Sequence, residues 1–251
     1  MNFKMKVELF FMKKMGIPIF NRILEREKKM ANIKGVVLED EFSPERFEII
    51  LESVKISVEN YTLSPPKRTI LSIISNMNRS LSSIKDNPPS PQKVIDEETL
   101  SEFKTYAKSL GVFSMGFAKL PRHLIFKDMA VIHDNAIVLA LEMDNNLMEL
   151  APSKKTQTMI MKTYDSLGIA SNKLTSFLRK RGFSAQAGHP LGGLVLYPPL
   201  AEKAGLGWHG AHGLIITPEH GPRVRLTAIY VINCLTQITR KLENEHSNPQ
   251  S

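Results

Sequence analysis

Two long apolar runs place the strongest limit on the fold of this chain. Residues 136–143 read AIVLALEM, and such a nearly continuous apolar run is typical of a strand buried on both faces. Residues 224–232 read VRLTAIYVI and predict a second strand. Shorter strands are indicated at 112–120 and 213–217, the latter joined to 224–232 by the PEHGP turn. The chain must therefore build a sheet.

Three further segments follow helical spacing. Residues 96–111 predict a helix with Asp96 as its N-cap and Gly111 just beyond its end. Residues 155–182 predict one or two helices, and residues 198–207 predict a short helix that begins at a proline. Together with the strands, this pattern indicates a mixed fold of the α/β (α+β) class.

A proline-rich segment divides the chain. Residues 82–96, SSIKDNPPSPQKVID, contain three prolines and few apolar residues, as linkers do. We therefore expect a mostly helical N-terminal region over 1–95, a core domain over 96–236 and a polar tail over 237–251.

Charge and hydropathy exclude some functions. The formal net charge is +8, but the basic residues are scattered apart from FLRKRG at 177–182, so we predict a mixed surface and no nucleic-acid partner. No apolar run approaches the ~18 residues of a membrane span, and the apolar run within 1–20 is too short for a secretory signal. The sequence predicts a cytoplasmic protein with no membrane association. Its single cysteine, Cys234, cannot form an intrachain disulfide or a cysteine-based metal cluster.

Residues 204–226, AGLGWHGAHGLIITPEHGPRVRL, contain five glycines and three histidines. Gly205, Gly207 and Gly210 match the spacing G-x-G-x-x-G, but here a helix precedes and a strand follows, which excludes a Rossmann site. No P-loop sequence is present. His209 and His212 have no third candidate ligand at a spacing typical of metal sites, so no metal site is predicted.

The same segment carries a resemblance to a known family. LTSFLRKRGFSA at 174–185 and PLAEKAGLGWHGAHGLIITPEHGPRVRL at 199–226 resemble the corrinoid domain of cobalamin-dependent reductive dehalogenases. The PLA-x-KAGLGW-x-G-x-H core is also similar to epoxyqueuosine reductases. The resemblance covers roughly 97–232. It implies a nitroreductase-like α/β core that binds cobalamin base-off, without a protein residue as lower ligand.

A corrin ring is broad and flat, so the backbone must approach it closely, and glycine allows this approach. The residues that the resemblance assigns to cofactor binding are Gly205, Leu206, Gly207, Trp208, His209, Gly210, His212 and Gly213. Trp208 would either stack on the ring or fill the core. No D-x-H-x-x-G motif is present, which disfavours a histidine-ligated cobalamin module. The alternative cofactor is FMN, as in flavin-dependent nitroreductases.

The resemblance also implies a catalytic pair. Tyr164 corresponds to the tyrosine that donates a proton, and Arg225 corresponds to its basic partner. The alternative is that Tyr164 packs at the edge of the core and Arg225 lies on a solvated strand face. His189 falls near the substrate pocket, where it would exchange hydrogen bonds and titrate near neutrality, or else lies on the surface. Leu191 falls where epoxyqueuosine reductases have an acidic residue, which disfavours that activity.

The relatives continue into two cysteine-rich cluster motifs, whereas this sequence has only Cys234. We therefore expect electrons to come from an external donor, such as a ferredoxin or a flavoprotein, and we expect a corrinoid as ligand and a possible homodimer. Three functions remain open at this point. The chain is a corrinoid-dependent reductase, a cobalamin-binding protein for storage or trafficking without turnover, or a flavin enzyme of the nitroreductase type.

Overall fold

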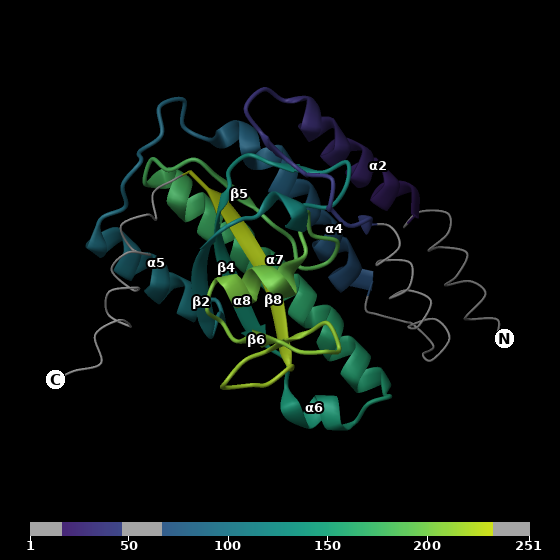
Figure 1. Cartoon of the computed structure of the whole chain (residues 1–251). Helices are drawn as coiled ribbons and strands as arrows, with labels where there is room; N and C mark the ends of the chain where they lie inside the picture. Colours follow the sequence, from purple (N-terminus) through teal and green to yellow (C-terminus); the bar gives the residue numbers. More distant parts are fainter. Residues whose placement is uncertain (1–16, 47–66, 233–251) are drawn as a thin grey trace.

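The computed structural model describes residues 17–46 and 67–232 of the chain. The predictions for residues 1–16, for Cys234 and for the polar tail lie outside these described residues. Within them, helices and strands alternate around one main sheet (Figure 1), which confirms the mixed fold class.

The main sheet has four antiparallel strands in the order β2-β4-β8-β5. Their bounds are β2 Ser114–Lys119, β4 Asn135–Glu142, β8 Val224–Val231 and β5 Ala185–Ala187. The apolar runs therefore form the two central strands, as predicted, and six of the eight residues of β4 are buried. Because neighbouring residues of a strand point to opposite faces, this sheet has a core on each side.

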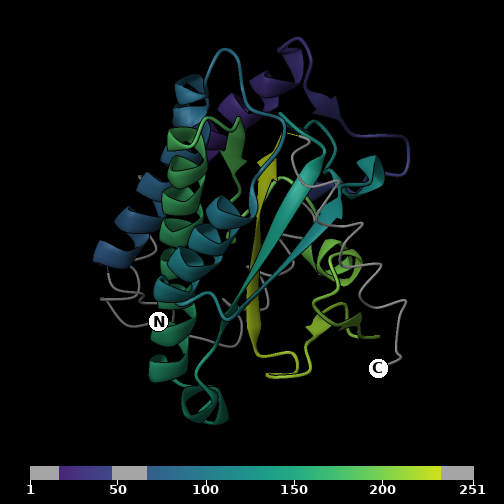
Figure 2. The ribbon, with the colours of Figure 1, turned by 90° about the vertical axis from the view of Figure 1, so that its left-hand side faces the viewer.

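Two helices cover one face of the sheet (Figure 2), namely α5 (Glu97–Ser109) and α7 (Lys154–Lys180). Helix α5 starts as predicted, because the Asp96 carboxylate accepts a hydrogen bond of 2.7 Å from the backbone N–H of Thr99. Residues 155–182, predicted as one or two helices, form the single helix α7. Leu167, Leu174 and Leu178 of α7 have no exposed surface, since they pack on the sheet.

The opposite face of the sheet packs against α8 (Tyr197–Lys203) and the loops before it. Leu226, Ala228 and Tyr230 of β8 point to this side, whereas Ile229 and Val231 point to α7. By this alternation Arg225 belongs to the α7 side of the sheet.

The described N-terminal region is built mainly from α2 (Ile17–Lys28) and α4 (Lys67–Ser82). Helix α4 packs along α7 (Figure 1), so the region covers the outer side of that helix. A short strand, β1 (Val37–Leu38), pairs with β3 (Ala130–Val131) of the core. The domain boundaries themselves stay a prediction. The remaining short elements are η2 Lys29–Asn32, η3 Ser83–Asp86, η4 Arg122–Leu124, α6 Asn145–Glu149, β6 Trp208–His209 and β7 Ile215–Ile216.

The strand predicted over 213–217 was too long. The strand β7 covers only Ile215–Ile216, which pairs with Trp208–His209 in a small hairpin, and Thr217 makes a single bridge to Gly221. Gly213 has a positive φ of +79°, and the N–H of Gly210 donates to the carbonyl of Leu214, so the chain turns where a strand was expected. In the described part of the chain, no helix is both long and apolar enough to cross a membrane.

Candidate functional site

The short strand β5 leaves a gap at one edge of the main sheet. Strand β5 pairs with Ile229–Val231 of β8, whereas β4 pairs with all of β8. Beyond this point the N–H of Gly188 donates to the Ala228 carbonyl at 2.7 Å, and the chain leaves the sheet as the loop 188–193. Among the described residues, Val224–Thr227 therefore have no strand neighbour on this side.

Tyr164 and Arg225 meet beside this gap. Nη1 of Arg225 donates a hydrogen bond of 2.7 Å to the phenolic oxygen of Tyr164, and the guanidinium carbon lies 4.0 Å from the centre of the tyrosine ring. Nη2 of Arg225 contacts Sδ of Met143 at 3.1 Å, and Nε is buried without a partner among the described residues. Arg225 is thus half-buried, so the alternative of a solvated strand face is wrong for this residue. Tyr164 does pack at the edge of an apolar cluster, as the same alternative held. The structure brings the predicted pair together; its catalytic role stays a prediction.

The direction of the hydrogen bond between Arg225 and Tyr164 has a chemical consequence. A guanidinium only donates, so the tyrosine oxygen accepts and keeps its own proton for another partner. No bond donated by Tyr164 occurs among the described residues. No carboxylate of the described residues lies within ion-pair distance of Arg225. The guanidinium therefore orients the phenol and leaves its proton free for another partner.

His189, in the loop 188–193, packs on α7 one helical turn beyond Tyr164. Its ring packs on Gly168, where a Cβ atom would lie only 2.5 Å from Nε2 of the histidine. Nδ1 faces the backbone of Leu191, at 3.1 Å from its nitrogen, whereas Nε2 is buried without a hydrogen-bond partner in the described structure. Tyr164 and Gly168 are four residues apart on one face of α7, so His189 and Tyr164 are neighbours along that face.

Two expectations for His189, exposure on the surface and titration near neutrality, were wrong. The residue is buried, with 5% of its surface exposed, so the alternative of a surface histidine fails. Burial disfavours the charged ring and lowers the pKa of His189 to about 4, so it does not titrate near neutrality. His189 is thus a neutral, buried hydrogen-bonding group.

This burial makes the stability of the protein depend on pH. The pKa of His189 is about 4 in the folded state and 6.5 in its ordinary state, so between these values the unfolded chain binds more protons. The free energy of unfolding should therefore fall as the pH is lowered from 6.5 to 4, by about 3 kcal/mol for this residue. Urea denaturation at a series of pH values measures this slope.

The variant His189→Gln should reduce that slope without abolishing it. His133 is the control, because burial also lowers its pKa to about 4 and its contribution remains in the variant. A slope that is the same in the variant and the original protein would contradict the burial of His189.

The glycine-rich segment forms an exposed hairpin of β6 and β7. Trp208 is 53% exposed and Leu214 is 51% exposed, while His209 and His212 are also exposed. Trp208 does not fill the core, so that alternative is wrong. Leu206, in contrast, is buried in the core next to α8.

The glycines of this segment have different roles. Gly207 is required by the hairpin itself, because a Cβ atom there would lie 2.1 Å from the carbonyl oxygen of Ile216. Gly205, Gly213 and Gly221 have open space where a Cβ atom would stand. An exposed indole beside uncovered backbone fits a broad, flat ligand such as a corrin, because both can approach its face without displacing other groups. No group of three His, Cys, Asp or Glu side chains that could hold a metal ion occurs among the described residues.

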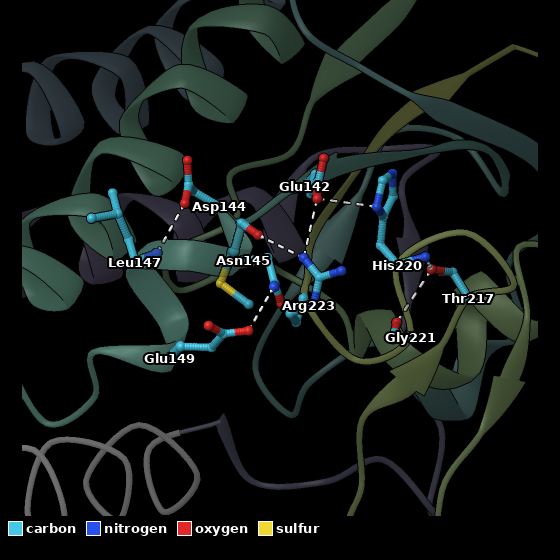
Figure 3. A network of polar contacts seen from close by, with 10 residues as sticks. Glu142, Asp144, Asn145, Leu147, Glu149, Thr217, His220, Gly221 and Arg223 are labelled. Carbon is cyan, nitrogen blue, oxygen red and sulfur yellow. Dashed lines mark hydrogen bonds and ion pairs between the residues drawn. The ribbon is translucent and has the colours of Figure 1, made fainter.

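A polar network beside the site was missed in the sequence. Oε1 of Glu142 accepts a hydrogen bond of 3.1 Å from Nη1 of Arg223 and lies 3.1 Å from Nδ1 of His220 (Figure 3). Nη1 of Arg223 also donates to the carbonyl of Met143 at 3.2 Å, and Asp144 caps α6. The network ties the end of β4 to the turn before β8, and it thus fixes the segment that carries Arg225. The residues EMD at 142–144 and the PEHGP turn are the sequence features that form this network. Their contact could not be predicted, because it joins residues about eighty positions apart in the sequence.

Two further polar groups hold the loop 188–193. The hydroxyl of Tyr197 donates to the carbonyl of His189 at 3.1 Å, and the hydroxyl of Ser171 donates to the carbonyl of Gly188 at 2.9 Å. Both residues are buried, and nothing in the sequence pattern distinguishes them from core residues.

The described residues thus form the fold of a part of the reductive dehalogenases. Two solved structures show this: the catabolic reductive dehalogenase NpRdhA, with a TM-score of 0.53, and a reductive dehalogenase described with a mechanism for B12-dependent dehalogenation, with a TM-score of 0.56. Both are 16% identical in sequence; the likeness covers 64% and 66% of this chain and 26% of each solved chain.

Sequence comparison agrees with the fold. The chain is 36% identical over 97 residues to the tetrachloroethene reductive dehalogenase of Dehalobacter restrictus, and 32% identical over 98 residues to that of Sulfurospirillum multivorans. These segments make up 38% and 39% of this chain but only 17% and 19% of the relatives. No family model matches the chain. The resemblance to reductive dehalogenases is confirmed, for a segment that is much shorter than they are.

Proposed function

We propose that this chain binds cobalamin, base-off, beside the open edge of β8, and that Tyr164 donates a proton during the reductive removal of a halide from an organic substrate. The observation that carries this proposal is the hydrogen bond of 2.7 Å between Arg225 and Tyr164 at that edge. A phenol that keeps its proton, and has a cation at its oxygen, is equipped as a general acid. The relatives are named as dehalogenases, which supports the substrate class.

In this proposal the hairpin, Tyr164 and Arg225 have different roles. The exposed hairpin, with Trp208 and the open backbone at Gly213, would hold the flat face of the ring. Bound cobalamin supplies a strong reductant next to the substrate. Tyr164 donates its proton to the carbon that loses the halide, and Arg225 stabilises the phenolate left behind. The step consumes two electrons and one proton, breaks the carbon–halogen bond, forms a carbon–hydrogen bond and releases halide.

The two electrons come, in this proposal, from a separate donor protein such as a ferredoxin or a flavoprotein. The support is that residues 17–46 and 67–232 contain no cysteine, so this part of the protein holds no iron–sulfur cluster and its electrons must reach it from outside. A site without its own electron source also fits a second candidate, a cobalamin-binding protein for storage or trafficking that does not turn over. FMN in place of cobalamin is the alternative cofactor.

The first experiment separates the cofactors. The protein is mixed with hydroxocobalamin or with FMN, desalted, and examined by ultraviolet–visible spectroscopy. A base-off cobalamin spectrum that persists after desalting is the expected result, and retention of FMN alone would overturn the proposal. Reduction with a strong chemical reductant, followed by tetrachloroethene, then separates turnover from storage, because only turnover releases chloride.

Trp208→Ala tests the role of the hairpin. The indole is half exposed, so its loss should change the free energy of unfolding by less than about 0.5 kcal/mol. If the indole stacks on the ring, the loss of about 1.4 kcal/mol should weaken cobalamin binding about tenfold, as measured by spectroscopic titration. Leu150→Ala is the control, because Leu150 is 50% exposed and lies outside the hairpin. Equal affinities of all three proteins would contradict stacking.

A further inference from the structure

Arg46, in the N-terminal region, reaches into the core beside the candidate site. Its side chain is buried, with 4% of its surface exposed. Nη1 donates a hydrogen bond of 2.7 Å to Oε2 of Glu27 on α2, and lies 3.3 Å from Sδ of Met129. Nη2 donates to the carbonyl oxygen of Gly192. Arg46 thus connects helix α2 with the loop 188–193.

The loop that Arg46 holds packs on α7 one helical turn from Tyr164. His189 packs on Gly168 of α7, and Leu191 contacts the same apolar cluster as Tyr164. Gly192 has a positive φ of +69°, so its carbonyl is turned in a way that ordinary residues rarely adopt. The hydrogen bond from Arg46 to this carbonyl therefore fixes an unusual backbone position.

A buried ion pair needs an explanation other than stability. Removing two charges from water costs about as much as their attraction returns, so well-packed apolar residues often serve a core equally well. Here burial raises the pKa of Glu27, although the charge of Arg46 opposes the shift. What apolar residues could not replace is a directed donor to the Gly192 carbonyl.

We propose that Arg46, with Glu27 as its counterion, is a positioning residue that holds the loop 188–193 against α7 and so sets the position of His189 beside Tyr164. The described part of the N-terminal region thereby supports the site through Arg46 and Glu27. The inference rests on the proposed function only in treating this loop as a wall of the site. The positioning itself is a property of the protein without cofactor.

The test follows the imidazole signals of His189 by NMR in cofactor-free protein, assigned with His189→Gln. In Arg46→Ala the loop should loosen, so the pKa of His189 should rise from about 4 toward 6.5, and amide exchange of Gly188 and Leu191 should accelerate at least about tenfold. Arg46→Lys should restore part of both effects, because it keeps a cation and a donor. Glu27→Gln should show them more weakly, and it serves with Arg46→Lys if Arg46→Ala does not fold.

Lys28→Ala is the matched control, since it breaks an exposed ion pair with Asp128 next to Glu27 on the same helix. It should leave His189 and the loop amides unchanged. Unaltered His189 signals and loop exchange in folded Arg46 and Glu27 variants would overturn the proposal. Failure of the original protein to bind cobalamin, with the loop responding as described, would instead refute the proposed function and leave the positioning intact.

Discussion

Tyr164→Phe is expected to lower the rate of reductive dehalogenation at least about 100-fold while cobalamin affinity stays within about twofold. The substitution removes only the hydroxyl, which accepts the hydrogen bond from Arg225 and holds the proton to be donated. The ring and its contact with the guanidinium remain. Turnover is measured without oxygen, on cobalamin-loaded protein with a chemical reductant, by chloride release from tetrachloroethene.

Tyr106→Phe is the control for this experiment. Tyr106 is a half-buried tyrosine on α5 that packs against Phe177, and it lies outside the candidate site. Its variant should keep the full rate. A Tyr164→Phe protein that releases halide as fast as the original would show that Tyr164 is not the proton donor. Loss of both cobalamin binding and rate would show that the hydroxyl serves the cofactor instead.

Gly207→Ala should have the second large effect, on the hairpin that carries the predicted cofactor residues. Gly207 has a φ of +153°, and an added Cβ atom would meet the carbonyl oxygen of Ile216 at 2.1 Å. The strands β6 and β7 must then separate, at a cost of about 1–3 kcal/mol in the free energy of unfolding. Because Trp208 follows directly, we expect cobalamin affinity to fall at least about tenfold, as measured by titration and by urea denaturation.

The matched control is Gly35→Ala. Gly35 also has a positive φ, of +87°, but nothing lies within 4 Å of the added atom. Gly35→Ala should therefore lower the free energy of unfolding by about 1 kcal/mol, the conformational cost without a clash. Its cobalamin binding should be unchanged. If Gly207→Ala binds cobalamin as well as this control does, the hairpin is not part of the cofactor site.

The local elements of the fold could be predicted because their signals lie within a few residues. The cap at Asp96 and the apolar run of β4 depend on neighbouring side chains, and both were confirmed. The extent of the 213–217 strand was wrong, because its pairing partner is two residues long and ends at a glycine turn. Strand length is set by the partner, and the sequence of one strand does not contain it.

The candidate site, too, was predicted only in part from the sequence. The resemblance indicated Tyr164 and Arg225, and the structure places them in contact. The predicted exposure and titration of His189 were wrong, because its burial depends on Gly168 of α7 and on a loop that Arg46 holds. Arg46 could not be found from the sequence, since its bond to Gly192 joins segments that no local pattern connects.

The early end of β5 has one more consequence. The backbone amides and carbonyls of Val224–Thr227 that face away from β4 have no strand to satisfy them among the described residues. An unpaired edge of this kind invites association with the extended backbone of another molecule. A ligand rich in amide groups that lay along this edge would provide the missing donors and acceptors. Binding of such a ligand would therefore also protect the protein against self-association through the same edge.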